Sequence, residues 1–484
     1  MPRLSRRNFL TMAAAGAGLA AAHVWIPKKV FAAPPALGVV KRVLILHAEG
    51  GMRSSCLFNA DVTPQFNPFG KLGPGDVDST GAPLVASGIG WTAGKLLAGN
   101  GQPLTLATWG GERMPLLPQI ADRISVLGAV DHDPDATIGE SQHQAANRHM
   151  CTGYADGQTG LLTIITKELA GKYALAPTIV ASTSPLAASV YGEGAGELAR
   201  YRPIRLNGPL DFRAPRQDPR HDAPEPERAL ERSFDEAMLR ARPNAMDGRL
   251  ADFALAKDLG LAYGGVLASD ALRVETAPDA VLGATIDGAP LTNAMLADAF
   301  GRETDPGGAF GPTLALGVRL LQLGSPAVAL GLVGFDLHSE EAQRLPSLAG
   351  SLSRAMAALH FTLSRIADPA APGKSYFDTT LVILTSEFNR DNVSDAIEAG
   401  YKRGFNRGDG SDHHGSMPCR IQSFPMMGGA VPGGRLIGLG TDERLKPRGA
   451  PFRSASVLAT LLQALGIDHA PWLPGIDPLA EIYG

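Results

Sequence analysis

Several features are scarce in this 484-residue sequence. It contains three cysteines, and aromatic residues make up 6% of it. Basic and acidic residues nearly balance, giving a formal net charge of −4, so the strongly basic surface typical of nucleic-acid binding is absent. The few cysteines exclude a small disulfide-stapled fold, and 44% hydrophobic residues exclude a disordered chain. We therefore expect a large globular protein that binds no nucleic acid.

The first 32 residues have the pattern of a twin-arginine export signal. Ser5-Arg6-Arg7-Asn8-Phe9-Leu10 carries the arginine pair, an apolar Ala/Gly-rich stretch runs from Leu10 to Ile26, and Val30-Phe31-Ala32 offers small residues to a signal peptidase. A glycine-diluted run of this length is marginal for a hydrocarbon core of about 30 Å. We therefore expect cleavage near residue 32, and not retention of the segment as a membrane anchor.

Export sets further expectations for the mature chain. It would cross the membrane folded, with the twin-arginine translocase as its partner, and work in the periplasm or outside the cell. Cleavage removes five basic residues and no acid, which changes the net charge from −4 to −9 and argues against stable membrane association. In an oxidising compartment, Cys56, Cys151 and Cys419 allow one disulfide and one remaining thiol, in a pairing that the sequence leaves open.

Short apolar runs alternate with amphipathic stretches along the chain. Strands are expected at 41–47, 124–128, 178–181, 327–333 and 380–385, and helices at 141–151, 226–261, 314–323 and 348–366. Strands without polar alternation are typical of a parallel sheet covered on both faces. The alternation predicts an α/β fold, a three-layer α/β/α sandwich with a mostly parallel central sheet.

The mature chain, 33–484, is expected to form a single domain. The stretch 202–249 is rich in Arg, Asp, Glu and Pro and poor in residues that favour strands. We interpret it as part of a charged helical insertion around 202–262, and a separate small domain is the alternative.

Polar side chains follow the predicted strands, where ligands of open α/β sheets bind. Asp336 and His338 follow one strand, Glu387 follows another, and a glycine-rich loop carries Asp412, His413 and His414. Asp336 and His338 project to the same side of an extended segment. Carboxylates and imidazoles are ligands of Zn²⁺ and Mn²⁺. The pattern predicts that these groups converge on one site for a divalent metal (Zn, Mn or Mg).

The ordered motifs resemble the domain-of-unknown-function 1501 proteins, which are placed in the alkaline-phosphatase-like superfamily. The resemblance is carried by the arginine-pair signal and by a series of short segments: the Gly50-Gly51 loop, Gly334-Phe335-Asp336-Leu337-His338, Ser386-Glu387-Phe388-Asn389-Arg390, Ser411-Asp412-His413 and the turn Gly428-Gly429-Ala430-Val431-Pro432-Gly433-Gly434. It implies an alkaline-phosphatase-like α/β/α sandwich in which Asp336, His338, Glu387, Asp412 and His413 are candidate metal ligands.

The sequence departs from the family pattern at the first loop. Arg53 stands where the family usually has Asp, and an arginine repels a metal but can bind an anionic oxygen bidentately. Ser54 and Ser55 occupy the place where superfamily enzymes carry a hydroxyl nucleophile, although a hydrogen-bonded turn serine is the simpler interpretation of either one. Asn389 also replaces a family glycine. Two metals, one metal and none are all compatible with this pattern.

Three functions follow as hypotheses. The leading one is a metal-dependent hydrolase or transferase of a small phosphate or sulfate ester, in which Ser54 or Ser55 attacks, Arg53 and metal stabilise the ester oxygens, and His143 acts as acid or base. The second is a non-catalytic binding or assembly protein that keeps the fold without metals. The third is a copper protein, suggested by sulfur and imidazole residues at 148–151, 414–419 and 426–427.

Overall fold

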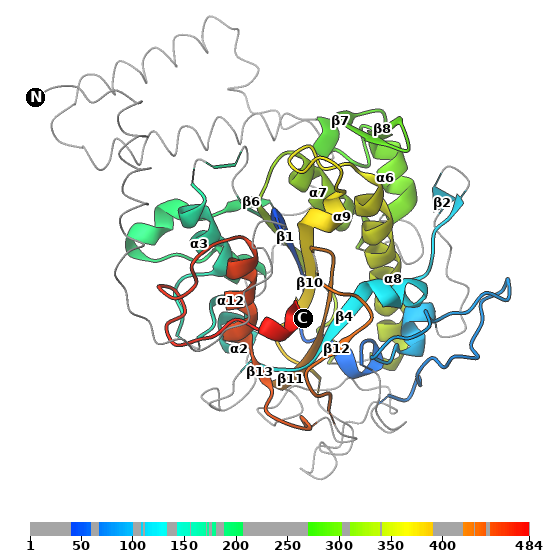
Figure 1. Cartoon of the computed structure of the whole chain (residues 1–484), viewed down its shortest axis with the longest axis horizontal. Helices are drawn as coiled ribbons and strands as arrows, with labels where there is room; N and C mark the ends of the chain where they lie inside the picture. The colour runs from blue at the N-terminus through cyan, green and yellow to red at the C-terminus, as the bar shows by residue number, and fades with distance from the viewer. Residues whose placement is uncertain are drawn as a thin grey trace, which may run out of the picture. The chain divides into compact units, whose positions relative to one another are not determined.

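The computed structural model describes residues 40–59, 67–99, 108–109, 112–132, 143–154, 156–170, 172–173, 177–180, 188–206, 270–302, 310–338, 341–390, 420–429, 431–441 and 446–483. Among them, nine strands form one sheet in the order β12-β4-β11-β10-β1-β9-β5-β6, with β13 also paired to β4 (Figure 1). The strands are β1 (Arg42–Ala48), β4 (Ile124–Asp131), β5 (Thr178–Val180), β6 (Ile204–Leu206), β9 (Ala327–Leu332), β10 (Thr380–Ser386), β11 (Ile421–Met427), β12 (Leu436–Ile437) and β13 (Phe452–Arg453).

The sheet is parallel apart from β11, which runs antiparallel to β10 and β4. At its centre, β1 pairs with β10 on one side and β9 on the other. Ala48 at the end of β1 is level with Ser386 of β10 and Leu332 of β9. The three loops that follow these strands therefore leave the same edge of the sheet, side by side. The chain's order also reverses there, since β9 and β10 flank β1, and such a point is where open α/β sheets bind ligands.

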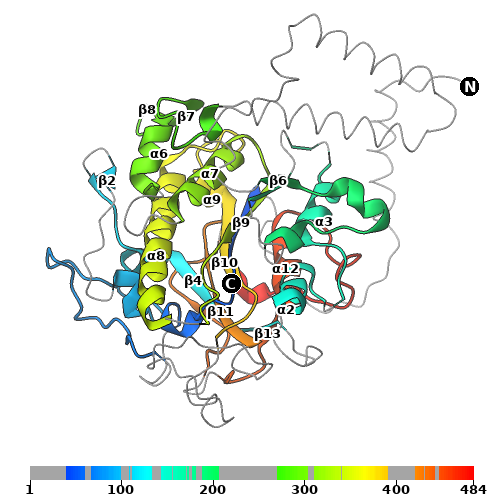
Figure 2. The ribbon, with the colours of Figure 1, turned by 180° about the vertical axis from the view of Figure 1, so that it is seen from behind.

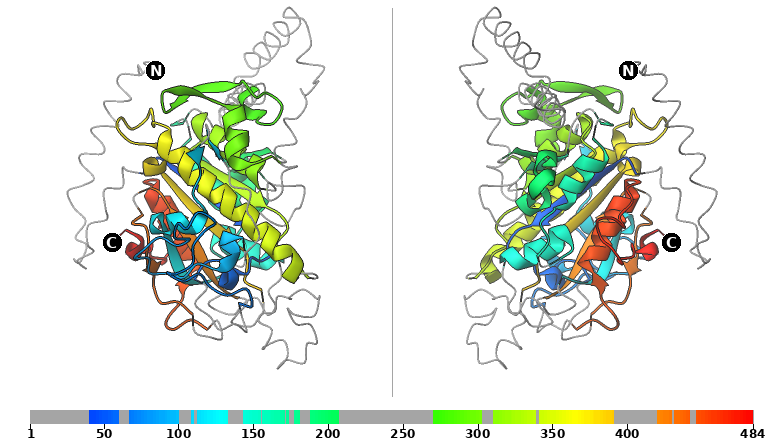
Figure 3. Two further views of the ribbon diagram at one scale, coloured as in Figure 1. Left: turned by 90° about the vertical axis from the view of Figure 1, so that its right-hand side faces the viewer. Right: turned by 90° about the vertical axis from the view of Figure 1, so that its left-hand side faces the viewer.

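Helices cover both faces of the sheet, as Figures 1, 2 and 3 show. On one side lie α6 (Asn293–Phe300), α7 (Gly311–Gln322) and α8 (Glu341–Arg365), and on the other α2 (His143–Thr152), α3 (Leu161–Glu168) and α12 (Ser454–Ala464). Side chains alternate along β1, so Leu44 and Leu46 join the core beneath the first group while Val43 and Ile45 join the core beneath the second. This double burial explains why the strands lack polar alternation.

Smaller elements complete the described part of the chain. The hairpin β7 (Val281–Ile286) and β8 (Ala289–Thr292) turns at Asp287-Gly288, where both residues have positive φ, as a tight two-residue hairpin loop requires. The others are the pair β2 (Thr108–Trp109) and β3 (Glu112–Arg113), the short helix α9 (Tyr376–Thr379) and several 3-10 turns, including η1 (Ser54–Cys56). Among the described residues, no helix is both long and apolar enough to cross a bilayer.

The expected three-layer α/β/α architecture is confirmed, and each of the five expected strands is present. Sequence reasoning missed β11, because Pro425 and the polar pair Gln422-Ser423 are untypical of a central strand, yet all seven of its residues are buried. The insertion was expected around 202–262, and within that range Ile204–Leu206 form β6, paired parallel with β5. Residues 207–269 and the export signal, 1–32, lie outside the described residues.

Candidate functional site

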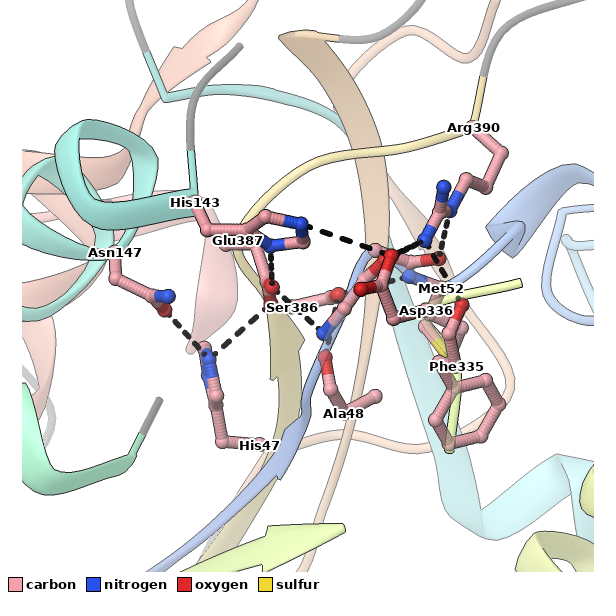
Figure 4. A network of polar contacts seen from close by, with 12 residues as sticks. His47, Ala48, Met52, His143, Asn147, Phe335, Asp336, Ser386, Glu387 and Arg390 are labelled. Carbon is pink, nitrogen blue, oxygen red and sulfur yellow. Dashed lines mark hydrogen bonds and ion pairs between the residues drawn. The ribbon is translucent and has the colours of Figure 1, made fainter. Parts of the chain in front are cut away.

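The site is built on the loops after β1, β9 and β10, with helix α2 beside them (Figure 4). The loop after β1 contains Gly50 and Gly51, which have φ values of +101° and +89°. A Cβ on Gly50 would lie 2.3 Å from the Asp336 amide nitrogen, and one on Gly51 would lie 2.3 Å from the Phe388 ring. Both positions therefore need glycine, for conformation and for space. The glycine pair allows the three loops to approach one another closely.

Arg390 ties these loops together from inside the protein. Its guanidinium is fully buried and donates to the backbone carbonyls of Gly50, Gly51 and Phe335 and to the Asp336 carboxylate. The distance from Arg390 Nε to the Gly51 carbonyl oxygen is 3.2 Å. A guanidinium presents several donors in a rigid plane, so one side chain can hold several acceptors at once. Arg390 thus fixes the position of Asp336 relative to the glycine pair.

Glu387 is the buried carboxylate of the site. Its Oε1 accepts from the Gly50 amide at 2.6 Å and lies 3.1 Å from His143 Nδ1, and its Oε2 lies 3.5 Å from His47 Nε2. Burial on its own raises the pKa of this carboxyl. The hydrogen bond with His143 and the nearby His47 imidazole outweigh burial and hold the pKa well below its usual range. Glu387 is therefore a carboxylate at neutral pH.

His143, Asp336 and His338 form the open part of the site. Asp336 Oδ1 lies 2.9 Å from His338 Nε2 and 3.6 Å from His143 Nε2. One ligand atom from each residue lies within 4.8 Å of the other two. Their side chains are partly exposed, from 21% for His143 to 48% for Asp336, so the cluster faces solvent.

The cluster has the composition of a metal site. Two imidazoles and a carboxylate are donors that suit Zn²⁺, and a zinc-binding histidine usually donates its second ring N–H to a carboxylate. Glu387 meets that second condition for His143. The residues therefore fit a divalent metal held by His143, Asp336 and His338, with Glu387 behind His143 and not beside it as a ligand. Arg390 also binds Asp336 and would compete for the same carboxylate.

The first-loop residues predicted to be catalytic are all buried. Arg53 makes a bidentate ion pair with Glu341 at the start of α8, with two N–O distances of 2.9 Å. The Ser54 hydroxyl accepts from the Ser423 amide of β11 at 3.2 Å, and Ser55 is 4% exposed. Arg53 is thus engaged with an internal carboxylate, and a substrate role for the three residues stays a prediction.

The remaining predicted ligands, Asp412, His413 and His414, lie outside the described residues, as does Cys419. The described sulfur residues suggested for copper are core residues, namely Met150, Cys151, Met426 and Met427. Cys56 and Cys151 are buried and form no disulfide with each other, and burial raises the pKa of Cys56 to about 12 and that of Cys151 well above its usual value. Both thiols are therefore protonated at neutral pH.

Three polar residues near the site were not predicted from the sequence. His47 and Asn147 are fully buried and contact each other, and burial raises the pKa of Glu49 from 4.5 to about 7. Asn147 follows His143 by one helical turn, and this i, i+4 spacing is the signal that could have identified it. In the sequence, His47 is the last residue of an apolar run and indicates only a strand. Its contact with Glu387 becomes visible only in the folded structure.

The family model described as "Protein of unknown function (DUF1501)" matches residues 40–476. The chain belongs to this family. No curated protein matches the sequence. Two solved structures are similar to the chain at 10% identity each: Ps i-CgsB, covering 90% of this chain and 75% of the other with a TM-score of 0.30, and the lipoteichoic acid synthase LtaP from Listeria monocytogenes, covering 91% and 74% with a TM-score of 0.28. The chain is assigned to the α/β class from its own central sheet and the helices that cover it, and not from these two similarities.

Proposed function

We propose that the chain is a metal-dependent hydrolase or transferase that acts on a phosphate or sulfate ester. The observation that carries this proposal is the convergence of His143, Asp336 and His338 beside the carboxyl ends of the central strands. These side chains come from α2 and the loop after β9, and they meet beside a buried carboxylate. Strand ends at a switch point are where α/β enzymes place their chemistry.

Each residue of the cluster has a defined task in this proposal. Glu387 accepts the Nδ1–H of His143, which leaves the Nε2 lone pair directed toward Asp336. His338 and Asp336 complete the ligand set, and Arg390 keeps the Asp336 loop in place. A divalent metal (Zn, Mn or Mg), when bound, would neutralise charge on the ester oxygens and lower the pKa of the attacking hydroxyl or water. The substrate would be small and anionic, because a bound divalent cation attracts the negatively charged oxygens of a phosphate or sulfate ester.

The export motif supports the location of this activity. We infer that the twin-arginine translocase carries the folded chain to the periplasm or beyond, and that the segment 1–32 is then removed. Replacing both Arg6 and Arg7 with lysine should leave the precursor in the cytoplasm, which fractionation and immunoblotting would detect. Normal export of that double variant would contradict the proposed route.

The test of the function is metal content and turnover of protein exported by its native host. Elemental analysis should find Zn, Mn or Mg, and the protein should hydrolyse an aryl phosphate or an aryl sulfate. Asp336→Ala should lose both the metal and the activity, because the carboxylate is the anionic ligand of the set. Asp298→Ala, a change at an exposed carboxylate on α6, should alter neither. Metal-free, inactive protein across both substrate classes would overturn the proposal.

A second candidate function is supported by the two internal arginines. Asp336 is bound by Arg390, and Glu341 is bound by Arg53, so two carboxylates near the loops already have cationic partners. Such pairing is what a non-catalytic binding or assembly protein would have if it kept the fold without metals. In that case, native protein would contain no metal, and titration with Zn²⁺ would show no saturable site even after removal of competing buffer ions.

A further inference from the structure

A closed ring of buried contacts lies behind His143. Helix α2 contributes His143 and Asn147, strand β10 contributes Thr385, the loop directly after β10 contributes Glu387, and strand β1 contributes His47. Figure 4 shows His143, Asn147, Glu387 and His47 in this arrangement. His143 and Asn147 share a helix face because they are one turn apart. His47 is the register partner of Thr385 across the β1–β10 pair. The imidazole of His47 therefore lies between the helix and the neighbouring strand.

The contacts of His47 use both of its ring nitrogens. Nε2 lies 2.9 Å from Asn147 Oδ1 and 3.5 Å from Glu387 Oε2, and Nδ1 lies 3.0 Å from the Thr385 hydroxyl. Asn147 Oδ1 and the Glu387 carboxylate are both acceptors, which assigns the proton to Nε2. Nδ1 then accepts from Thr385, whose oxygen lies 3.1 Å from the Tyr191 hydroxyl. Of these groups, His47 Nε2 is the one that faces Glu387.

Glu387 has a different partner on each oxygen. Oε1 accepts from the Gly50 amide and faces His143, whereas Oε2 makes no hydrogen bond among the described residues. The His47 Nε2, which is hydrogen-bonded to Asn147, is the donor that faces Oε2, at 3.5 Å. A fully buried carboxylate oxygen without a facing donor would be costly. The His47 imidazole therefore sets the rotation of the Glu387 carboxylate, and that rotation directs Oε1 to His143 Nδ1.

We infer that His47 and Asn147 are positioning residues. They hold Glu387 and helix α2 so that the Nε2 lone pair of His143 faces the metal position between His143, Asp336 and His338. This inference rests on the proposed function for its metal, but the arrangement of His143 is a property of the chain itself. From strand β1, the His47 ring contacts α2 through Asn147, β10 through Thr385 and the loop after β10 through Glu387. Removal of its Nε2–H therefore frees both the carboxylate and the helix. Neither residue reaches a substrate.

The inference is tested with two substitutions at one position. His47→Leu removes the donor, whereas His47→Gln keeps an amide N–H near the place of Nε2. In a Zn²⁺ titration of the purified full-length mature protein, His47→Leu should bind roughly 10- to 100-fold more weakly than wild type, the usual effect of removing a partner behind a metal ligand. His47→Gln should recover most of that loss. His360→Gln, which removes a half-buried imidazole that packs against Phe377, should bind as wild type does.

A second readout does not need the metal. ¹⁵N NMR of histidine-labelled, metal-free protein should show His143 as the Nδ1–H tautomer in wild type and in His47→Gln, and as a mixture of tautomers in His47→Leu. If His47→Leu does not fold, Asn147→Leu should produce the same mixture, because it removes the contact between His47 and α2. A wild-type protein that binds no metal would overturn the proposed function alone. An unchanged His143 tautomer in the folded variants would overturn the positioning role.

Discussion

Replacement of Arg390 by methionine tests whether this residue is an internal clamp. Methionine fills similar space but donates no hydrogen bond, so the buried carbonyls of Gly50 and Gly51 lose their guanidinium donor. Each buried acceptor left unpaired costs about 1–3 kcal/mol, which gives about 2–6 kcal/mol for the pair. The Phe335 carbonyl still accepts a hydrogen bond from the Leu337 amide, and the Asp336 side chain is half exposed to solvent. Neither group therefore adds much to the free-energy cost of the substitution.

The measurement is urea unfolding followed by far-UV circular dichroism. A loss of this size is a large part of the 5–15 kcal/mol by which a protein is usually stable, so the midpoint should fall clearly. Arg344→Met, at an exposed position of α8, is the matched control and should change the free energy of unfolding by less than about 0.5 kcal/mol. A folded Arg390→Met variant within about 1 kcal/mol of wild type would refute the clamp. Retained stability with lost substrate affinity would show that Arg390 binds anions instead.

Two further predictions concern the loop after β1. Gly51→Ala should destabilise the protein more than Gly283→Ala. Both glycines have positive φ, but only a Cβ on Gly51 would meet a neighbour, the Phe388 ring. Thermal unfolding measures the difference, and equal decreases in melting temperature for the two variants would contradict the steric argument. Glu49→Gln should become increasingly stabilising between pH 4.5 and about 7, since burial makes the folded state hold a proton that the unfolded state releases. The free energy of unfolding of Glu49→Gln should exceed that of wild type by about 3 kcal/mol at the upper end of this range. A difference between the two proteins that does not change with pH would refute the prediction.

The local sequence pattern was enough to predict most of the architecture. Unbroken apolar runs such as Leu381–Leu384 identify strands that are buried on both faces, and the helices between them imply a parallel sheet. The same pattern placed Asp336, His338 and Glu387 at strand ends, and the structure brings them together around His143. The architecture could be predicted because alternation, spacing and strand polarity are properties of neighbouring residues.

Strand β11 shows where local patterns fail. Its proline and polar residues disfavour a central strand. The segment nevertheless lies between β10 and β4 and pairs antiparallel with both. Burial of Phe424 and Met426 stabilises it there. Pairing partners far away in the chain therefore outweighed the intrinsic preference of the segment.

The sequence by itself determined the layered α/β class and the polar groups in the loops after β9 and β10, and it predicts an export signal over residues 1–32. Only the tertiary structure decided how those groups are paired. Arg53 lies against Glu341, 288 residues away, and Arg390 reaches back 340 residues to Gly50. His47 is joined to Glu387 and Asn147 only because β1, β10 and α2 pack together. A charged side chain can serve a substrate, a metal or a buried partner, and which of these it meets depends on folding of the whole chain.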